Sequence, residues 1–298
     1  MKKVISVSLG TSKRDYNFTI DLLGEKVDIK RIGTDGDKEK ARQIFLENDG
    51  KVDAFGLGGA SLFFYIKGRI YWFRDMKKII KGVTKTPIVD GVGMRETLER
   101  RAIFYIDKNV VPLKGKTALV PTSVDRYGMT EALSQVGTRL LIGDLVFGLG
   151  IPIVFHSLKT IDFLSYPLLP IITILPMDIL YPTGKKEEEN TPKYKWLFEK
   201  ADIIAGDFLF IRRYMPENLS GKIIITNTTT PENVEEVRKR GAKFLITTTP
   251  RINGRSFGTN VVEAIALAIM GKRKFDFNFS EYNKFLDAVQ FKPDIIEF

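Results

Sequence analysis

The chain of 298 residues has no cysteine and only one histidine, His156. The absence of cysteine excludes disulfides, thiolate zinc sites, iron–sulfur clusters and a cysteine nucleophile, and it suits a reducing compartment. With one histidine, a metal site would depend mostly on carboxylates, and a Ser-His-Asp triad has a single possible centre. The apolar run at the N-terminus, MKKVISVSLG, is too short for a signal sequence, so we expect a cytoplasmic protein that spans no membrane.

Recognition motifs for nucleic acid are also missing. There is no block of lysines, no RNA-recognition strand and no zinc-finger spacing, and the basic residues are spread along the chain. The net charge of +10 therefore suits a small anionic metabolite, and nucleic acid is not expected as the main ligand. The composition, rich in Lys, Glu and Ile, also points to a thermophilic source.

Apolar residues make up 44% of the chain and charged residues 28%, which is enough for one large or two modest cores. Strand-like runs alternate with helix-like runs, which predicts an α/β protein with parallel sheets covered on both faces. We predict a mixed-sheet N-terminal domain with hairpins, a Rossmann-like doubly wound C-terminal domain and a tail that packs back on the body. The predicted ranges are 1–113, 114–270 and 271–298.

Local signals define several elements within this pattern. Gly24-Glu25-Lys26 and Lys67-Gly68 each separate two strand-like runs and predict hairpins. Asp37 and Gly50 bracket an amphipathic run that is typical of a helix. Further helices are expected at Met94–Asn109, Gly258–Met270 and Ser280–Gln290.

The segment 146–182 is very apolar and contains five prolines. Charged residues and prolines interrupt its apolar runs, so it is not a membrane-spanning helix. We interpret it as short buried helices at a domain or subunit interface, which would suit a homodimer. A lid over a site is the alternative.

Ligands of open parallel sheets bind beyond the carboxyl ends of the strands, where this chain places many Gly, Ser, Thr, Asp, Asn and Arg residues. Arginines and an asparagine in these loops, or beside a helix start, are candidates for holding the anionic group of a substrate. These candidate residues are Arg14, Arg95, Arg212, Arg213, Arg255 and Asn260.

One of these strand ends, Lys114–Leu133 (KGKTALVPTSVDRYGMTEAL), is similar to the start of a dinucleotide-binding domain but has one glycine after the strand where three are usual. Gly128 stands at the third glycine position, and Ser123 or Arg126 would hold a phosphate by side chain while Asp125 caps the helix. Asp144, at the end of the next strand, would accept a hydrogen bond from a ribose 2′-hydroxyl and favour NAD over NADP.

Oxidation of an alcohol needs a nearby group that takes the hydroxyl proton. The candidate proton-transfer residues are Lys13, Asp90 and Lys159. The carboxylates of Asp35, Asp37 and Asp90 leave a second possibility open, a phosphate-handling enzyme that uses bound Mg²⁺.

Several motifs together resemble a bacterial family described as quinate/shikimate 5-dehydrogenase-like. The motifs are VSLGTSKRD, RIGTDGD, VDAFGLGG, LERR, VDRYGM, AGDFLFIRRYMP, ITTTP and GRSFGTNVVEA. The resemblance implies a Rossmann-type cofactor domain and reversible NAD(P)-linked oxidation of a cyclic polyol acid, with the cofactor turn at Ser123, Asp125, Arg126 and Gly128 together with Asp144. The usual glycine-rich turn of shikimate dehydrogenases is absent here.

Two functions follow from these observations. The first is an NAD(P)-dependent oxidoreductase acting on a small anionic hydroxy acid in an interdomain cleft. The second is a non-enzymatic or regulatory protein that keeps the scaffold and binds a nucleotide or an acidic metabolite, which the altered turn favours.

Overall fold

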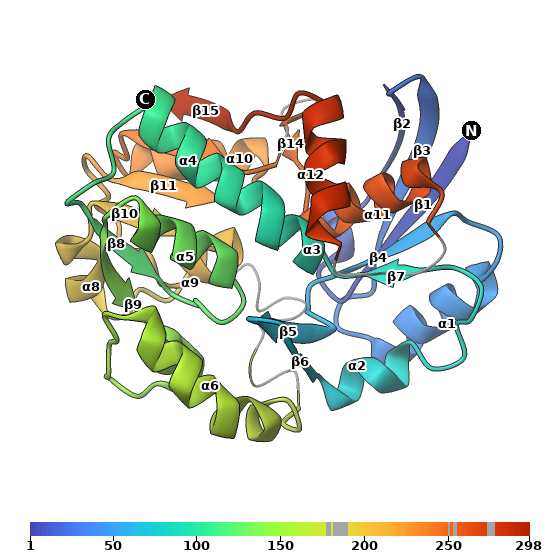
Figure 1. The fold of residues 1–298 in the computed structure, drawn as a ribbon, viewed down its shortest axis with the longest axis horizontal. Helices are drawn as coiled ribbons and strands as arrows, with labels where there is room; N and C mark the ends of the chain where they lie inside the picture. The colour runs from blue at the N-terminus through green and yellow to red at the C-terminus, as the bar shows by residue number, and fades with distance from the viewer. Residues whose placement is uncertain (177–179, 181–189, 250, 253–254, 273–277) are drawn as a thin grey trace. The chain divides into compact units, whose positions relative to one another are not determined.

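The computed structural model describes residues 1–176, 180, 190–249, 251–252, 255–272 and 278–298, and the chain forms two compact units. Unit 1 comprises Met1–Met94 and the described parts of Leu168–Glu187 and Gly258–Gln290. Unit 2 comprises Arg95–Pro167, the described parts of Glu188–Phe257, and Phe291–Phe298. The chain is therefore an α/β protein of two units, as predicted, and both contain a mainly parallel sheet (Figure 1).

The sheet of unit 1 has the strand order β2-β3-β1-β4-β7. Its strands are β1 (Lys2–Ser8), β2 (Tyr16–Leu22), β3 (Glu25–Gly33), β4 (Ala54–Gly58) and β7 (Ile88–Val89). Only β2 is antiparallel to its neighbour, because it forms a hairpin with β3. Leu23 and Gly24 make the turn with φ values of 52° and 80°, the left-handed conformation that a two-residue hairpin turn requires. The predicted first hairpin is confirmed.

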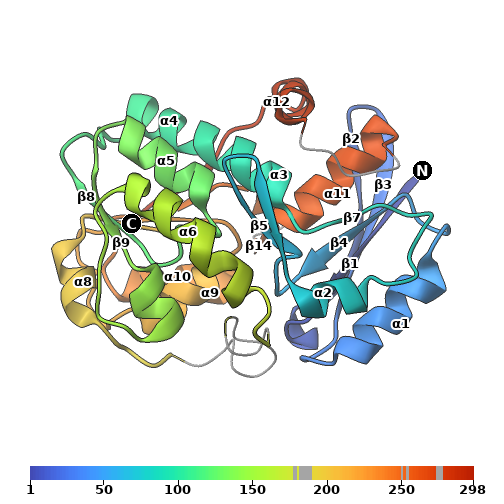
Figure 2. The ribbon, with the colours of Figure 1, turned by 60° about the horizontal axis from the view of Figure 1, so that its bottom comes forward.

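Helices cover both faces of this sheet. Because successive residues of a strand point to opposite faces, neighbouring residues of β4 contact different helices. In β4, Phe55 packs edge-on against Phe45 of α1 (Lys38–Asn48), with ring centroids 5.1 Å apart. The next residue, Gly56, faces α11 (Thr259–Met270), where an added Cβ would lie 2.9 Å from the Asn260 carbonyl. Figure 2 shows α1 and α11 on opposite sides of the strands.

The remaining elements of unit 1 are short. The second predicted hairpin is confirmed as the pair β5 and β6, with Lys67 and Gly68 in its turn. The bounds are η1 (Ser12–Arg14), β5 (Phe63–Ile66), β6 (Arg69–Trp72), α2 (Arg74–Ile79), α3 (Val92–Met94) and α12 (Phe279–Ala288).

The sheet of unit 2 has the order β9-β8-β10-β11-β12-β15, with all pairs parallel except β12–β15. The strands are β8 (Thr117–Val120), β9 (Arg139–Ile142), β10 (Ile203–Ala205), β11 (Ile223–Thr226), β12 (Phe244–Thr247) and β15 (Asp294–Glu297). The chain passes from β8 to β9 at one edge of the sheet, and from β10 to β11 and β12 toward the other edge. The sheet is therefore doubly wound, and its strand order reverses between β8 and β10. A short pair, β13 (Arg251–Ile252) and β14 (Arg255–Ser256), stands apart.

Alternate residues of the unit 2 strands enter two cores. Ala118 and Val120 join one core, with residues of α4, α5 and α6, whereas Leu119 joins the other, with residues of α8, α9 and α10. Figure 2 shows α4 and α5 on one side of the sheet and α9 and α10 on the other. The bounds are α4 (Arg100–Asn109), α5 (Tyr127–Gln135), α6 (Leu158–Ile172), α8 (Lys195–Lys200), α9 (Phe208–Tyr214) and α10 (Pro231–Lys239).

The structure places the boundary between the units after Met94 rather than after residue 113. The predicted helix Met94–Asn109 continues from α3 through a π-helical turn, η2 (Arg95–Glu99), into α4. Ile103 and Ile106 of α4 pack in the core of unit 2, which is why this helix belongs there. The tail also divides, because α12 belongs to unit 1 while β15 completes the sheet of unit 2.

The apolar segment 146–182 begins with a second π-helical turn, η3 (Asp144–Gly148), and continues into α6. Instead of several short buried helices, its described part contains one helix of 15 residues with an exposed apolar face. Its end, residues 177–179 and 181–182, lies outside the described residues. Among the residues that the structure describes, no helix has both the length and the apolar character needed to cross a bilayer.

Candidate functional site

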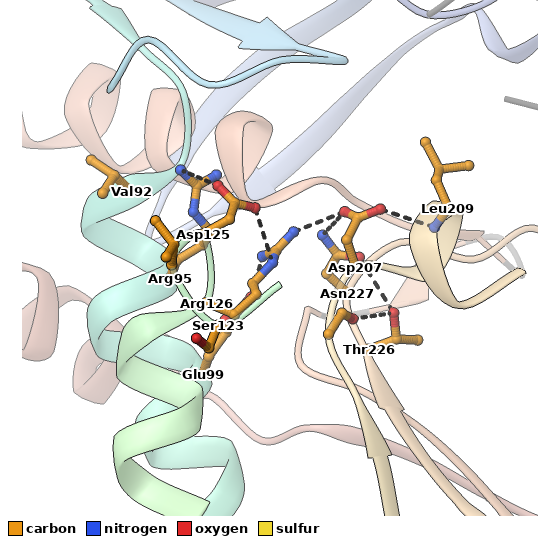
Figure 3. Close-up of polar contacts among 12 residues, drawn as sticks. Val92, Arg95, Glu99, Ser123, Asp125, Arg126, Asp207, Leu209, Thr226 and Asn227 are labelled. Atoms are coloured by element: carbon orange, nitrogen blue, oxygen red, sulfur yellow. Dashed lines mark hydrogen bonds and ion pairs between the residues drawn. The ribbon is translucent and has the colours of Figure 1, made fainter. Parts of the chain in front are cut away.

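A cluster of buried charges occupies the switch point of unit 2, at the carboxyl ends of β8 and β10 (Figure 3). Arg126 lies at its centre, immediately before α5, and its side chain is 3% exposed. One guanidinium nitrogen, Nη1, donates to Glu99 Oε1 at 2.5 Å and the other, Nη2, donates to Asp207 Oδ2 at 2.8 Å. Burial lowers the pKa of Arg126, but the carboxylates around it outweigh this effect and raise the pKa above its ordinary value.

Glu99 enters the cluster from the π-helical turn η2. A π turn widens a helix locally and is frequent at functional sites. Arg95 and Glu99, the first and last residues of this turn, are both buried and reach the same cluster. Burial raises the pKa of Glu99 to about 7, although Arg126 and Arg95 lower it. A carboxyl group that titrates near neutrality can both hold and release a proton.

Asp207 and Asn227 form the other side of the cluster, two residues after β10 and one residue after β11. The two oxygens of Asp207 have different partners: Oδ1 accepts from the backbone of Leu209 and so caps α9, while Oδ2 accepts from Arg126 and from Asn227 Nδ2 at 3.1 Å. Asn227 Oδ1 accepts from the backbone of Thr228 at 2.7 Å. These contacts hold the Asp207 carboxylate against the arginine.

Protonation of Glu99 sets the net charge of the cluster. Arg95 and Arg126 contribute two positive charges, while Asp125 and Asp207 contribute two negative ones. The cluster is thus neutral when Glu99 is protonated and carries one negative charge when Glu99 is ionised. Glu99 Oε2 is buried and accepts no hydrogen bond from the part of the chain that the structure describes, so this oxygen is the place for the proton.

The turn after β8 already holds an anion, the carboxylate of Asp144. Asp144 Oδ2 accepts from the backbone N–H and the hydroxyl of Ser123 at 3.0 and 2.6 Å, and Oδ1 accepts from the N–H of Val124 at 2.9 Å. Burial raises the pKa of Asp144, and these hydrogen bonds oppose the rise. The predicted roles of Ser123 as a phosphate ligand and of Asp144 as a ribose acceptor therefore conflict with the geometry, because the two residues bind each other.

The other predicted cofactor residues also make internal contacts. Arg126 forms ion pairs with the carboxylates of Glu99 and Asp207, so its guanidinium is not available to bind a phosphate in this arrangement. Asp125 lies 3.7 Å from Arg95 in the cluster, and Arg126, rather than Asp125, is the cap residue of α5. A Cβ added to Gly128 would lie 3.0 Å from Glu96 Oε2, so this glycine permits close packing of α5 on η2 instead of helix on strand. The dinucleotide implied by the resemblance does not fit this turn.

Of the three residues predicted to move a proton, Lys13 and Asp90 belong to unit 1 and Lys159 belongs to unit 2. Lys13 is exposed in η1 of unit 1, and Lys159 is exposed in the first turn of α6. Asp90 is buried in unit 1, where Oδ2 accepts from the backbone of Leu62 at 2.7 Å and Oδ1 from that of Val92 at 3.1 Å. Asp90 thus fixes two loops.

Among the predicted substrate-binding residues, Arg95 lies in the cluster. Arg212 and Arg213 occupy the last turn of α9, at the opposite end from Asp207, and Arg212 Nε donates to Glu236 at 2.7 Å. Arg213 lies over the ring of Tyr214.

The remaining three are Arg14, Asn260 and Arg255. Arg14 ends the short turn η1 of unit 1, and Asn260 Nδ2 donates to Ser6 Oγ at 3.0 Å, which ties α11 to β1. The backbone of Arg255 belongs to β14, and its side chain lies outside the described residues.

No group of three or more acidic or histidine side chains that could hold a metal ion is found in the described part of the chain. The acids considered for Mg²⁺ have other partners. Asp35 accepts from the backbone of Ser12, Asp37 caps α1, and Asp90 binds two backbone N–H groups.

Sequence reasoning missed Glu99 and gave no role to Asp207 or Asn227. The last two follow predicted strands, so strand-end position pointed to them. Glu99 stands four residues after Arg95, and a π turn that brings both into one cluster has no simple sequence signature.

Comparison with known proteins assigns the chain to a family without a described function. Residues 93–298 match the domain of unknown function DUF8754, and the chain belongs to this family. Residues 3–90 match a second domain of unknown function, DUF8753. These two ranges meet close to the boundary between the units after Met94. No curated protein matches the chain.

Among solved structures, the chain is similar to proteins of low sequence identity. One, from Mycobacterium smegmatis, is 10% identical over 100% of this chain and 91% of the other, with a TM-score of 0.35. An NAD-dependent malic enzyme from Thermotoga maritima is 13% identical over 97% and 84%, with a TM-score of 0.33. A component of dipicolinate synthase from Bacillus halodurans is 10% identical over 91% and 97%, with a TM-score of 0.28.

Proposed function

We propose that this protein is an oxidoreductase that acts on a small anionic hydroxy acid, with the charge cluster of unit 2 as its proton-transfer site. The observation that supports this proposal is Glu99, which is buried beside two arginines at the switch point and has a pKa of about 7. Oxidation of an alcohol releases a proton together with a hydride, and a carboxylate with a pKa near neutrality is suited to accept that proton.

The accessible edge of the cluster is acidic and polar. The side chains of Asp207 and Asp125 are 23% and 10% exposed, whereas that of Glu99 is not exposed at all. A substrate hydroxyl would first meet Asp207. The Arg126 guanidinium between Asp207 and Glu99 stays protonated, so the proton would reach Glu99 directly or through water and not through Arg126. Glu99 would then hold the proton, since its ionised form has the higher cost of burial.

The substrate class and the hydride acceptor come from the family resemblance. It implies a cyclic polyol acid such as quinate or shikimate, and NAD or NADP as the group that takes the hydride. Because the predicted turn holds Asp144 instead, we assign no residue and no step to the dinucleotide.

The test measures reduction of NAD or NADP by a panel of hydroxy acids, with the wild type, Glu99→Gln and the control Glu131→Gln. Glu131 is an acid of α5 that pairs with Arg100 outside the cluster. We expect turnover that rises with pH as Glu99 ionises near pH 7, a loss of about 100-fold or more in Glu99→Gln, and near-normal rates in the control. Equal rates in Glu99→Gln and wild type would contradict the role of Glu99.

A second candidate is a protein that binds an acidic metabolite or nucleotide without turning it over. It is favoured because Arg126 and Asp144, the residues predicted to bind the cofactor, both form hydrogen bonds within the protein. Calorimetric titration with NADH, NADPH and the same acids separates the two. Binding without turnover would support the second candidate, and turnover the first.

A further inference from the structure

The outer face of α6 and the turn that follows it carries a continuous stripe of exposed apolar side chains. Successive members are three or one residues apart, which places them on one side of a helix. We call this set the α6 stripe: Phe163, Tyr166, Pro167, Pro170, Ile171 and Ile174. The opposite side of the helix is buried, with Ile161 4% and Leu169 3% exposed, so the helix already has its inner contact.

The α6 stripe exposes more continuous apolar surface than isolated apolar residues on a protein surface would. Phe163 is 76% exposed, Tyr166 65%, Ile171 63% and Ile174 54%. With roughly 200 Å² for a whole large side chain, these four expose about 500 Å² of apolar surface before the prolines are added. Surface patches of this size on soluble proteins mark interaction sites. A standard interface buries about 800 Å² on each partner, which the stripe and its rim approach.

Charge distinguishes this surface from the rest of the molecule. The chain carries a net charge of +10, yet residues 160–176 include a single charged side chain, Asp162. Its Oδ1 accepts a hydrogen bond from the Tyr127 hydroxyl at 2.6 Å, which holds the carboxylate toward α5. The one cation of α6, the exposed Lys159, lies a turn before Phe163, at the end of the stripe. Two copies of this basic chain would therefore repel each other least where they meet along residues 160–176.

We propose that the α6 stripe is the interface between two copies of this chain. In a symmetric dimer the same patch meets itself, so the surface must be self-complementary, and an uncharged apolar stripe meets this condition. The stripe of one copy would lie antiparallel to that of its partner. Its midpoint falls between Pro167 and Pro170, which places these residues nearest the two-fold axis.

A lipid surface fits the stripe less well. Helices that lie on membranes carry several Lys and Arg residues along their polar face, whereas α6 has one lysine, Lys159, and no arginine.

The test is sedimentation velocity of the full chain over a wide range of concentration. We expect a wild-type dimer, and a monomer for Phe163→Glu combined with Ile171→Glu, with a dissociation constant raised about 100-fold or more because like charges would face each other. Phe104, 44% exposed in α4, provides the matched control, and Phe104→Glu is expected to remain dimeric. Circular dichroism checks that each variant is folded.

Because the chain has no native cysteine, a single introduced cysteine reports on the axis without interference. Under mild oxidation, Pro170→Cys is expected to form a disulfide-linked dimer, whereas Phe104→Cys is not. A monomeric wild type at every concentration would overturn the proposal, as would a dimer that survives the two glutamates. A monomer that binds phosphatidylglycerol vesicles through the stripe would reassign the surface to lipid.

Discussion

Replacement of Asp144 by alanine tests whether the turn after β8 is an anion site filled by the protein itself. The change removes the acceptor of three hydrogen bonds, from the Ser123 N–H, the Ser123 hydroxyl and the Val124 N–H. Each buried donor left without a partner costs about 1–3 kcal/mol, so we expect unit 2 to lose about 3–9 kcal/mol. The vacated turn would then offer backbone N–H groups to an external anion.

Phosphate is therefore expected to restore part of the stability of Asp144→Ala and none of that of the wild type. If phosphate binds with a dissociation constant on the order of 1 mM, 100 mM phosphate would return about 2.7 kcal/mol. The assay is urea unfolding in phosphate and in sodium chloride of equal ionic strength, followed by Trp196 of α8 in a Trp72→Phe background. Asp144→Asn, which keeps one acceptor oxygen, replaces Asp144→Ala if the alanine variant does not fold. Equal gains from phosphate in variant and wild type would refute the reasoning.

Three further predictions concern packing and ionisation. Because burial raises the pKa of Glu99 from 4.5 to about 7, its contribution to stability is fully present below pH 4.5 and is lost as the pH rises through 7. Relative to Glu99→Gln, the wild type should lose on the order of 3 kcal/mol across this window in urea titrations, and a constant difference would contradict the assignment. Gly128→Ala should destabilise unit 2 by about 1–3 kcal/mol, since its Cβ meets Glu96, whereas Gly148→Ala, with no atom within 4 Å, should change little in thermal melts. Phe45→Ala should cost about 3–5 kcal/mol of unfolding free energy, and a loss below about 1 kcal/mol would place the ring outside the core.

The fold could be predicted from the sequence where local chemistry determines it. Glycine turns defined both hairpins, and Asp37 marked the start of α1. The boundary between the units could not be found in this way. It lies inside a continuous helix just after Gly91 and Gly93, and only the packing of Ile103 and Ile106 assigns α4 to unit 2.

The site was predictable in position but not in composition. The rule that ligands bind at strand ends pointed to the loops of Arg126, Asp207 and Asn227, which the structure does bring together. Sequence alone could not show that the Asp144 carboxylate, at the end of the next strand, fills the turn after β8. A turn that binds this carboxylate and a turn that binds the phosphate of a ligand would need the same residue types. The arginines of α9 were misleading because helices also favour cations in their last turn.

The way the chain is divided between the units has a consequence for its synthesis. Unit 1 needs α11, which covers Gly56 of β4, and unit 2 needs β15, which pairs with β12 along residues 294–297. Each unit thus receives an essential element from residues 259–297, although many domains fold in order as they leave the ribosome. Neither unit can complete its sheet or its core while this stretch is still in the exit tunnel. The two units should therefore reach their final structures only after residue 297 has left the tunnel, at nearly the same time.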